Sequence, residues 1–266
     1  MSIGKLIGEG RTAEVYEWGC DRVLKLYKKG IKRNIIENEF RASKEILKVD
    51  IPAPEVFELI EYEDRLGIIS ERVYGHTMIK SILLKPWRMV NEAKRLAEIH
   101  KRIQKKIDVD LPRQKNRLKK QIESTDLLVE DIKEKIYKYL EKLSDDNILC
   151  HGDFHPDNIL ISKNKEIVID WMDAAIGNPA ADVARTSILF KYGSLPDDKS
   201  LLERKVVDFV RRKFYSEYIK HYTEICNIST EEIEVWELPI AAARLVEDIP
   251  ECEKAILIDY INKRIK

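Results

Sequence analysis

The feature that most restricts the fold of this chain is a change in hydrophobic spacing near residue 75. Before it, short apolar or alternating runs are separated by Gly and small polar residues, which is typical of β-strands. After it, apolar residues recur every three to four positions over long segments, which indicates amphipathic helices. We therefore expect an α+β protein with a small β-rich part at residues 1–75 and a larger, mostly helical part at residues 76–266.

The first part predicts a five-stranded sheet with one inserted helix. We expect strands at 3–7, 13–18, 23–27, 56–62 and 66–72 and a helix at 32–48 that Pro52 and Pro54 end. In the second part we expect helices at 87–105, 114–125, 129–143, 180–192, 200–224, 229–245 and 251–264, and a strand-and-loop island at 147–173. Two lobes joined near Tyr74 and Gly75 would bind ligands in the cleft between them.

Composition excludes several classes of protein. With 44% hydrophobic and 35% charged residues and no net charge, the 266 residues suit a globular chain rather than a disordered one. No apolar run reaches about 18 residues and the N-terminus lacks a signal sequence, so we expect a cytoplasmic protein. The four cysteines lie far apart, which predicts free thiols rather than a zinc motif or a disulfide framework.

The densest chemical signal is the segment 151–161, which reads HGDFHPDNILI. Asp153 precedes Asn158 by five residues, which is the spacing of a kinase catalytic loop, and Asp170 follows the apolar run 167–169. Phosphoryl transfer needs a carboxylate to orient the attacking hydroxyl and hard oxygen ligands to hold Mg²⁺ on the phosphates. We therefore expect Asp153 to be catalytic and Asn158 and Asp170 to bind the metal.

Residues near the N-terminus predict a nucleotide site. Gly8, Gly10 and Val15 keep part of a glycine-rich phosphate loop, in which backbone amides approach phosphate oxygens closely. Lys25 lies in the next strand, and alternation places it on the sheet face opposite to Leu24 and Leu26. We expect Lys25 to bind the phosphates.

Such a lysine needs a carboxylate partner on the following helix. Of the candidates Glu37, Glu39 and Glu45, Glu39 lies on the apolar stripe, whereas Glu37 lies off it and could pair with Arg41. We therefore predict that Lys25 pairs with Glu39. The backbone of Glu71 and Val73, where the last strand of the sheet ends, would suit an adenine edge, although an ordinary linker would look the same.

Over residues 4–263 the chain resembles the aminoglycoside phosphotransferase and choline kinase-like family, the small-molecule branch of the protein-kinase-like fold. The resemblance rests on HGDFHPDN at 151–158, IDWMDA at 169–174 and NPAADVA at 178–184. It implies a bilobal fold and a kinase that uses Mg²⁺ and ATP or GTP to phosphorylate a hydroxyl of a small molecule. It also implies that Asp153 is the catalytic base, that Asn158 and Asp170 hold the metal, and that Asp182 braces the loop.

The sequence does not identify the acceptor molecule. Nine acidic residues and one arginine lie in 224–253, and an acidic lining would suit an amine-bearing acceptor such as an aminoglycoside, a choline-like alcohol or an amino sugar. A solvated helix face would explain the same charges. The acidic candidates are Glu231, Glu232, Glu234, Glu237, Glu247, Asp248 and Glu251.

Two other function classes fit the sequence less well than a kinase does. A catalytically silent nucleotide-binding regulatory module is the main alternative, but Lys25, Asp153, Asn158 and Asp170 are all present. The basic stretch 101–120 has no aromatic residue for base stacking, so we expect no nucleic-acid partner, and we expect no membrane partner. The sequence leaves the oligomeric state undetermined.

Overall fold

The computed structural model describes residues 3–162, 165–193 and 201–265. The chain forms two compact units. The first unit comprises residues 1–81, 109–111 and 156–174, and the second comprises residues 82–108, 112–155 and 175–266. The α+β fold class is confirmed, with a five-stranded sheet and one helix near the N-terminus and helices in most of the remainder. The division into 1–75 and 76–266 stays a prediction.

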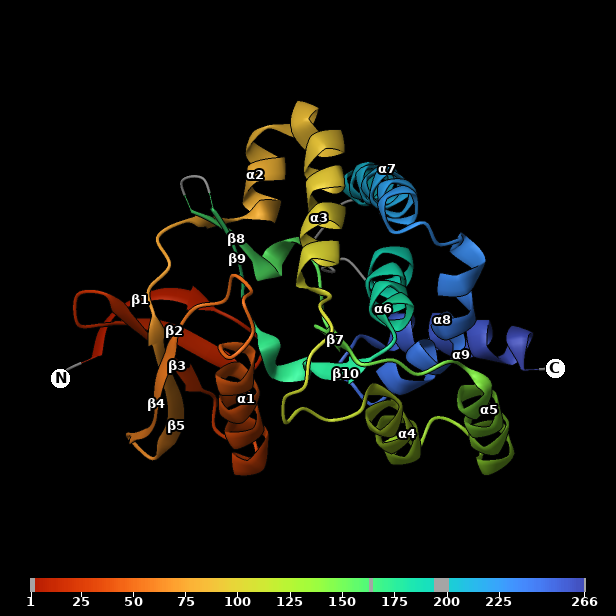
Figure 1. Cartoon of the computed structure of the whole chain (residues 1–266), viewed down its shortest axis with the longest axis horizontal. Coiled ribbons are helices and arrows are strands. Elements are labelled where there is room, and N and C mark those ends of the chain that lie inside the picture. The colour runs from red at the N-terminus through yellow and green to blue at the C-terminus, as the bar shows by residue number, and fades with distance from the viewer. Residues whose placement is uncertain (1–2, 163–164, 194–200, 266) are drawn as a thin grey trace. The chain divides into compact units, whose positions relative to one another are not determined.

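The first unit is built on an antiparallel sheet with the strand order β1-β2-β3-β5-β4. Its strands, drawn in red and orange in Figure 1, are β1 (Ile3–Glu9), β2 (Ala13–Trp18), β3 (Arg22–Tyr27), β4 (Val56–Tyr62) and β5 (Arg65–Glu71). Every predicted strand is present within two residues of its expected ends. Glu63 and Asp64 form the tight turn between β4 and β5, both with positive φ.

Helix α1 (Arg33–Ile46) packs against β4 and β5. Ile36 lies in one apolar cluster with Ala13, Tyr27, Val56 and Ile68, on the helix side of the sheet. Leu24 and Leu26 belong to a second cluster with Trp18 and Ile69. The alternation along β3 therefore puts Tyr27, and with it Lys25, on the face that α1 covers.

The rest of the first unit is a short sheet with two 3₁₀ turns. Strand β6 (His76–Thr77) pairs with β8 (Ile159–Ser162), and β8 pairs with β9 (Lys165–Val168). The turns are η2 (Pro156–Asn158) before β8 and η3 (Trp171–Asp173) after β9, and η3 packs against α1. Two residues of the predicted island at 147–173, Lys163 and Asn164, lie outside the described residues.

The second unit is mostly helical. Its elements are η1 (Pro86–Arg88), α3 (Met89–Ile103), α4 (Gln114–Ser124), α5 (Glu130–Lys142), β7 (Ile148–Cys150), β10 (Ala175–Gly177), α6 (Pro179–Tyr192), α7 (Leu201–Cys226), α8 (Thr230–Arg244) and α9 (Glu251–Arg264). Helix α6 packs against α8, α3 against α7, and β7 pairs with β10. Residues 180–188 of α6 are buried or nearly so, which makes α6 the core helix of this unit.

The expected helices are present, with ends that differ by at most two residues where both are described. Residue 200, at which one helix was expected to begin, lies outside the described residues. The sequence did not predict α2 (Met78–Leu84), β6 or β10. In α2 only Met78 and Ile82 are buried, while Leu83 and Leu84 are exposed, and a helix of 7 residues is too short to give a clear periodic signal. Among the described residues, no helix is long and apolar enough to cross a membrane.

Candidate functional site

Lys25 is the centre of a charged cluster in the first unit. Its Nζ donates to Glu39 Oε1 at 2.6 Å and to Asp170 Oδ1 at 3.1 Å. Burial lowers the pKa of Lys25, but the charges of Glu39 and Asp170 outweigh it and hold that pKa above its ordinary value. The ammonium group is therefore charged at any physiological pH.

The three glutamates of α1 that could have paired with Lys25 have different partners. Glu39 is buried on the sheet side of the helix, whereas Glu37 accepts from Arg33 at 2.7 Å. Glu45 accepts from Lys48 and from the backbone N–H of Asp110. The expected pairing of Glu37 with Arg41 is wrong, because Arg41 donates to Asn38 instead.

Asp170 and Asn158 lie on neighbouring segments of the first unit. The backbone N–H of Ile169 donates to the carbonyl of Asn158 at 3.0 Å, which joins the segment before η3 to η2. Asp170 adopts a left-handed backbone with φ of 65°, a conformation that aspartate tolerates better than most residues. Its carboxylate contacts Lys25, so one oxygen-donor residue of the expected metal pair is linked directly to the lysine.

Gly8 and Gly10 lie at the tip of the β1–β2 hairpin. Gly8 is opposite Val15, and the Gly10 N–H donates to the carbonyl of Ala13 at 2.8 Å. A Cβ added at Gly8 would meet Val15 at 3.7 Å and one at Gly10 would meet Ala13 O at 3.6 Å, both ordinary contacts. The fold itself would thus accept side chains here, which leaves close approach of a ligand as a reason for glycine.

The backbone where β5 ends is partly engaged. The Glu71 N–H donates to the carbonyl of Glu55 at 2.7 Å, and the Arg72 N–H donates to the carbonyl of Asp21 at 2.9 Å. Val73 is half-buried just beyond the strand. An adenine edge could therefore use the carbonyl of Glu71 but not its amide.

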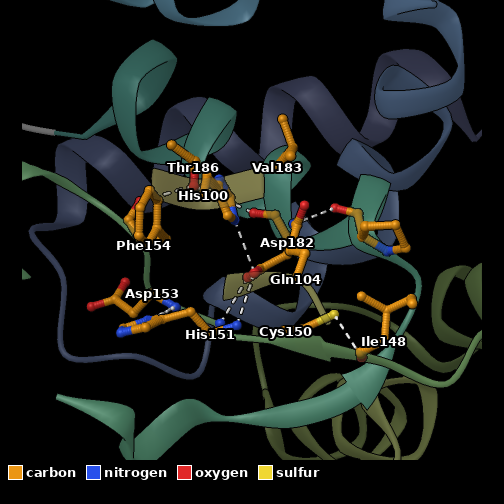
Figure 2. Close-up of polar contacts among 12 residues, drawn as sticks. His100, Gln104, Ile148, Cys150, His151, Asp153, Phe154, Asp182, Val183 and Thr186 are labelled. Atoms are coloured by element: carbon orange, nitrogen blue, oxygen red, sulfur yellow. Dashed lines mark hydrogen bonds and ion pairs between the residues drawn. The ribbon is translucent and has the colours of Figure 1, made fainter. Parts of the chain in front are cut away.

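The loop that carries Asp153 is fixed by α6 in the second unit (Figure 2). Asp182, completely buried, accepts from the backbone N–H groups of His151 and Gly152, both at 2.8 Å. Gly152 has φ of 82°, which a side chain would strain. Asp182 Oδ2 also lies 3.0 Å from His100 Nε2.

His100 of α3 lies in the core. It is fully buried, its Nδ1 lies 2.7 Å from the Tyr218 hydroxyl, and its ring stacks on Phe154 at 4.0 Å between centroids. Burial raises the pKa of Asp182, but its bonds to His100 and to the loop amides hold that pKa below its ordinary value. The loop thus rests on a buried carboxylate that stays charged.

Asp153 has side-chain partners of its own. Arg185 Nη2 donates to Asp153 Oδ1 at 3.0 Å, and His155 Nε2 lies 3.4 Å from Oδ2. Burial raises the pKa of Asp153, but His155 and the charge of Arg185 hold it well below its ordinary value. Arg185 was not among the residues predicted from the sequence. Its sequence signal is that it is the single arginine of α6, among mostly small and apolar residues.

Much of the acidic stretch 224–253 is used inside the fold. Glu237 is buried and binds Lys191 and Tyr260, while Glu253 binds Arg244. Glu232 completes a capping box with Ser229 at the start of α8. The exposed members are Glu224, Glu231, Glu232, Glu234, Asp248 and Glu251.

The donor set suits magnesium better than a transition metal. Among the described residues, no three His, Cys, Asp or Glu side chains gather in the way a metal ion would need. Mg²⁺ is commonly held by one or two protein ligands together with substrate phosphates, and carboxylate and amide oxygens are suitable donors. Asn158 and Asp170, whose segments are joined by the backbone bond from Ile169, supply one carboxamide and one carboxylate donor of this kind.

Comparison with known proteins gives a family and a fold. Residues 4–212 match the model of the phosphotransferase enzyme family. Among curated proteins, none matches this chain.

Several solved structures share the fold. A thermostable mutant of aminoglycoside phosphotransferase APH(4)-Ia, in its apo form, is 16% identical, with a TM-score of 0.62 over 99% of this chain and 92% of that one. The streptomycin-ATP-APH(2")-IIa ternary complex is 17% identical, with a TM-score of 0.58 over 99% and 91%. An aminoglycoside-3'-phosphotransferase of type VIII is 16% identical, with a TM-score of 0.58 over 90% and 91%.

Proposed function

Because the chain belongs to the phosphotransferase enzyme family, we propose that it is a Mg²⁺-dependent kinase that moves the γ-phosphate of ATP or GTP to a hydroxyl of a small molecule. The observation that carries this proposal is the cluster in which Lys25 bonds to both Glu39 and Asp170. In protein kinases the lysine that contacts the phosphates lies on a strand and pairs with a helix glutamate, while a nearby aspartate holds Mg²⁺, and Lys25, Glu39 and Asp170 form the same arrangement. A cytoplasmic location, where nucleotide and Mg²⁺ are available, is part of the same proposal.

In this proposal the first unit binds the nucleotide. Lys25 contacts the α- and β-phosphates, Glu39 keeps its ammonium group in place, and the amides around Gly8 and Gly10 approach the phosphates. Asn158 and Asp170 would hold Mg²⁺, which neutralises charge on the transferring phosphoryl group. The carbonyl of Glu71 and the backbone of Val73 are the candidates for the adenine edge.

Asp153 orients the acceptor hydroxyl. Its low pKa makes it a weak base that is charged when the acceptor binds and can accept a hydrogen bond, which suits a reaction in which positioning contributes more than early proton removal. The hydroxyl proton would pass to Asp153 as the new P–O bond forms.

For the acceptor we favour an amine-bearing alcohol. One structural relative binds streptomycin with ATP, and APH(4)-Ia binds hygromycin B with AMP-PNP. In this chain the exposed carboxylates Glu231, Glu234, Asp248 and Glu251 could meet a cationic acceptor.

An acceptor panel tests the function. Choline, aminoglycosides, amino sugars and neutral sugars would each be supplied with ATP or with GTP, and release of the nucleoside diphosphate would be measured with and without Mg²⁺. Mg²⁺-dependent release with an amine-bearing acceptor supports the proposal. Use of neutral or anionic acceptors alone would refute the amine-bearing class, and tight nucleotide binding without any turnover, even slow hydrolysis, would favour a regulatory module.

The variant Asp153→Asn tests the role of that carboxylate. We expect turnover to fall by about 100-fold or more, because the acceptor loses its orienting group, with nucleotide affinity nearly unchanged. Steady-state kinetics and calorimetric ATP titration would measure the two effects. A variant that loses ATP binding but keeps turnover per bound complex would contradict the assignment.

A further inference from the structure

A series of ion pairs between alternating acidic and basic side chains begins at Asp153 and continues through the second unit. Arg185 Nη2 donates to Asp153 Oδ1 at 3.0 Å, and its Nη1 and Nη2 donate to the two oxygens of Glu247 at 2.7 and 3.1 Å. Glu247 also accepts from Arg244 Nη1 at 2.7 Å, and Arg244 binds Glu253 at 2.6 Å. These ion pairs thus join the loop 151–155 to α6, to the segment after α8 and to α9.

Arg185 is held rigidly. Its side chain is only 9% exposed, and the two parallel bonds to Glu247 fix the plane of the guanidinium group. Burial lowers the pKa of Arg185, but Glu247 and Asp153 more than compensate, so the group stays charged. Its Nε is buried without a hydrogen-bond partner within the described part of the chain. The Nη2 group that donates to Asp153 is therefore held in a fixed position.

Several titratable side chains surround the Asp153 carboxylate in this unit. His155 lies beside Oδ2, His151 accepts from the backbone N–H of Asp153 at 3.2 Å, and Glu247 shares Arg185 with it. Arg117 on α4 also interacts electrostatically with Asp153, and burial together with the charge of Arg185 lowers the pKa of Arg117 to about 10. Of these groups, Arg185 donates a hydrogen bond to Oδ1.

We propose that Arg185 is a positioning residue that holds the Asp153 carboxylate in the one orientation that receives the acceptor hydroxyl. Glu247 in turn keeps Arg185 in place. This inference rests on the proposed function. An aspartate has a soft terminal torsion, so a carboxylate on a loop needs a fixed donor to present the same oxygen in every turnover. Lysine keeps the charge of arginine but loses the planar fork, so it cannot hold Glu247 and Asp153 in the same geometry.

The test uses three variants and a matched control. Arg185→Gln removes the charge and the fork, Arg185→Lys removes the fork alone, and Glu247→Gln weakens the anchor. The control is Lys191→Gln, which breaks a different ion pair of α6, that of Lys191 with Glu237 of α8 at 2.6 Å, without touching the loop. The first readout is Mg²⁺-dependent ATP hydrolysis, in which water is the acceptor.

We expect Arg185→Gln to lower kcat by about 10–100-fold with the KM for ATP within about twofold of the unaltered protein, because the loss is one of orientation. Arg185→Lys should lose about tenfold, Glu247→Gln less than Arg185→Gln, and Lys191→Gln less than twofold. Unchanged kcat in Arg185→Gln, or an equal loss in Lys191→Gln, would overturn the proposal.

A second readout needs no turnover. Protein labelled with ¹³C at the aspartate carboxyl carbon would be titrated by NMR, with Asp153→Asn identifying the signal. The Asp153 midpoint should move to higher pH in Arg185→Gln, since a neighbouring positive charge is lost, and stay low in Arg185→Lys and Lys191→Gln. An unmoved midpoint in Arg185→Gln overturns the contact itself. If the unaltered protein neither hydrolyses ATP nor phosphorylates an acceptor, the proposed function fails, and this titration still decides whether Arg185 controls Asp153.

Discussion

Several residues around Lys25 have a strained backbone or a buried polar atom. Asp170 has a left-handed backbone, and its carboxylate bonds to Lys25. Tyr27, next but one to Lys25, has a buried hydroxyl, and Glu39 has a buried Oε2, both without a hydrogen-bond partner in the described part of the chain. Such buried polar atoms cost free energy, which is tolerated where a site must hold charges in place.

At this scale we predict the effect of Lys25→Met. The substitution keeps the length of the side chain but removes the ammonium group, so ATP should bind about 10–100-fold more weakly, as expected for the loss of a charged hydrogen bond. Calorimetric titration with MgATP would measure the change. Lys48→Met, which removes the ammonium of a lysine paired with Glu45, serves as the control, and equal effects of the two substitutions would argue against phosphate binding by Lys25.

Helix α6 is the element that shapes the loop carrying Asp153. It starts with Asn178, whose side chain accepts from the Ala180 N–H, followed by Pro179 at the first helical position. One turn later Asp182 binds two loop amides, and Thr186 Oγ1 donates to the carbonyl of Phe154 at 2.8 Å. With Arg185 on Asp153, three side chains of one helix contact the loop 151–154.

For this element we predict that Asp182→Ala destabilises the protein by about 3–5 kcal/mol, because buried donors around it would lose their acceptor. Urea unfolding at neutral pH would measure the loss. Asp208→Ala on α7, which breaks a partly exposed pair with Arg211, should cost less than about 1 kcal/mol. Similar losses in both variants would contradict the role given to Asp182.

At the scale of the whole molecule, buried carboxylates make stability depend on pH. The pKa values of Asp153 and Asp182 are both held below the ordinary value, chiefly because hydrogen bonds and nearby positive charges outweigh burial. A carboxyl whose pKa is lower in the folded state stabilises the fold at neutral pH. That contribution is lost as the pH falls below the pKa of the unfolded chain, towards that of the folded state.

We therefore predict that the free energy of unfolding changes little between pH 7 and about pH 5 and falls steadily below about pH 4, near the ordinary pKa of aspartate. Urea unfolding at a series of pH values would follow the change. Asp153→Asn should show a shallower fall, since one of the two carboxylates is gone. A stability that rises on acidification would contradict the assignment of these pKa shifts.

The sequence by itself determined the sheet, most helices, the family resemblance and the choice of Glu39. These follow from local properties: period two in the strands, a period of three to four in the helices, and fixed spacings between chemical groups. Glu39 could be chosen because helical periodicity puts it on the stripe that faces the sheet, and the structure indeed bonds it to Lys25.

Only the tertiary structure decided which distant charges meet. The pairing of Arg185 with Glu247, 62 residues further along the chain, the partners of the buried Glu237 and the short strands β6 and β10 have no periodic signal. The acidic stretch looked like one surface in the sequence, but several of its carboxylates are bound by arginine or lysine within the fold. Ion pairs form between whichever groups helix packing brings within a few ångströms, and a one-dimensional pattern carries no record of that distance.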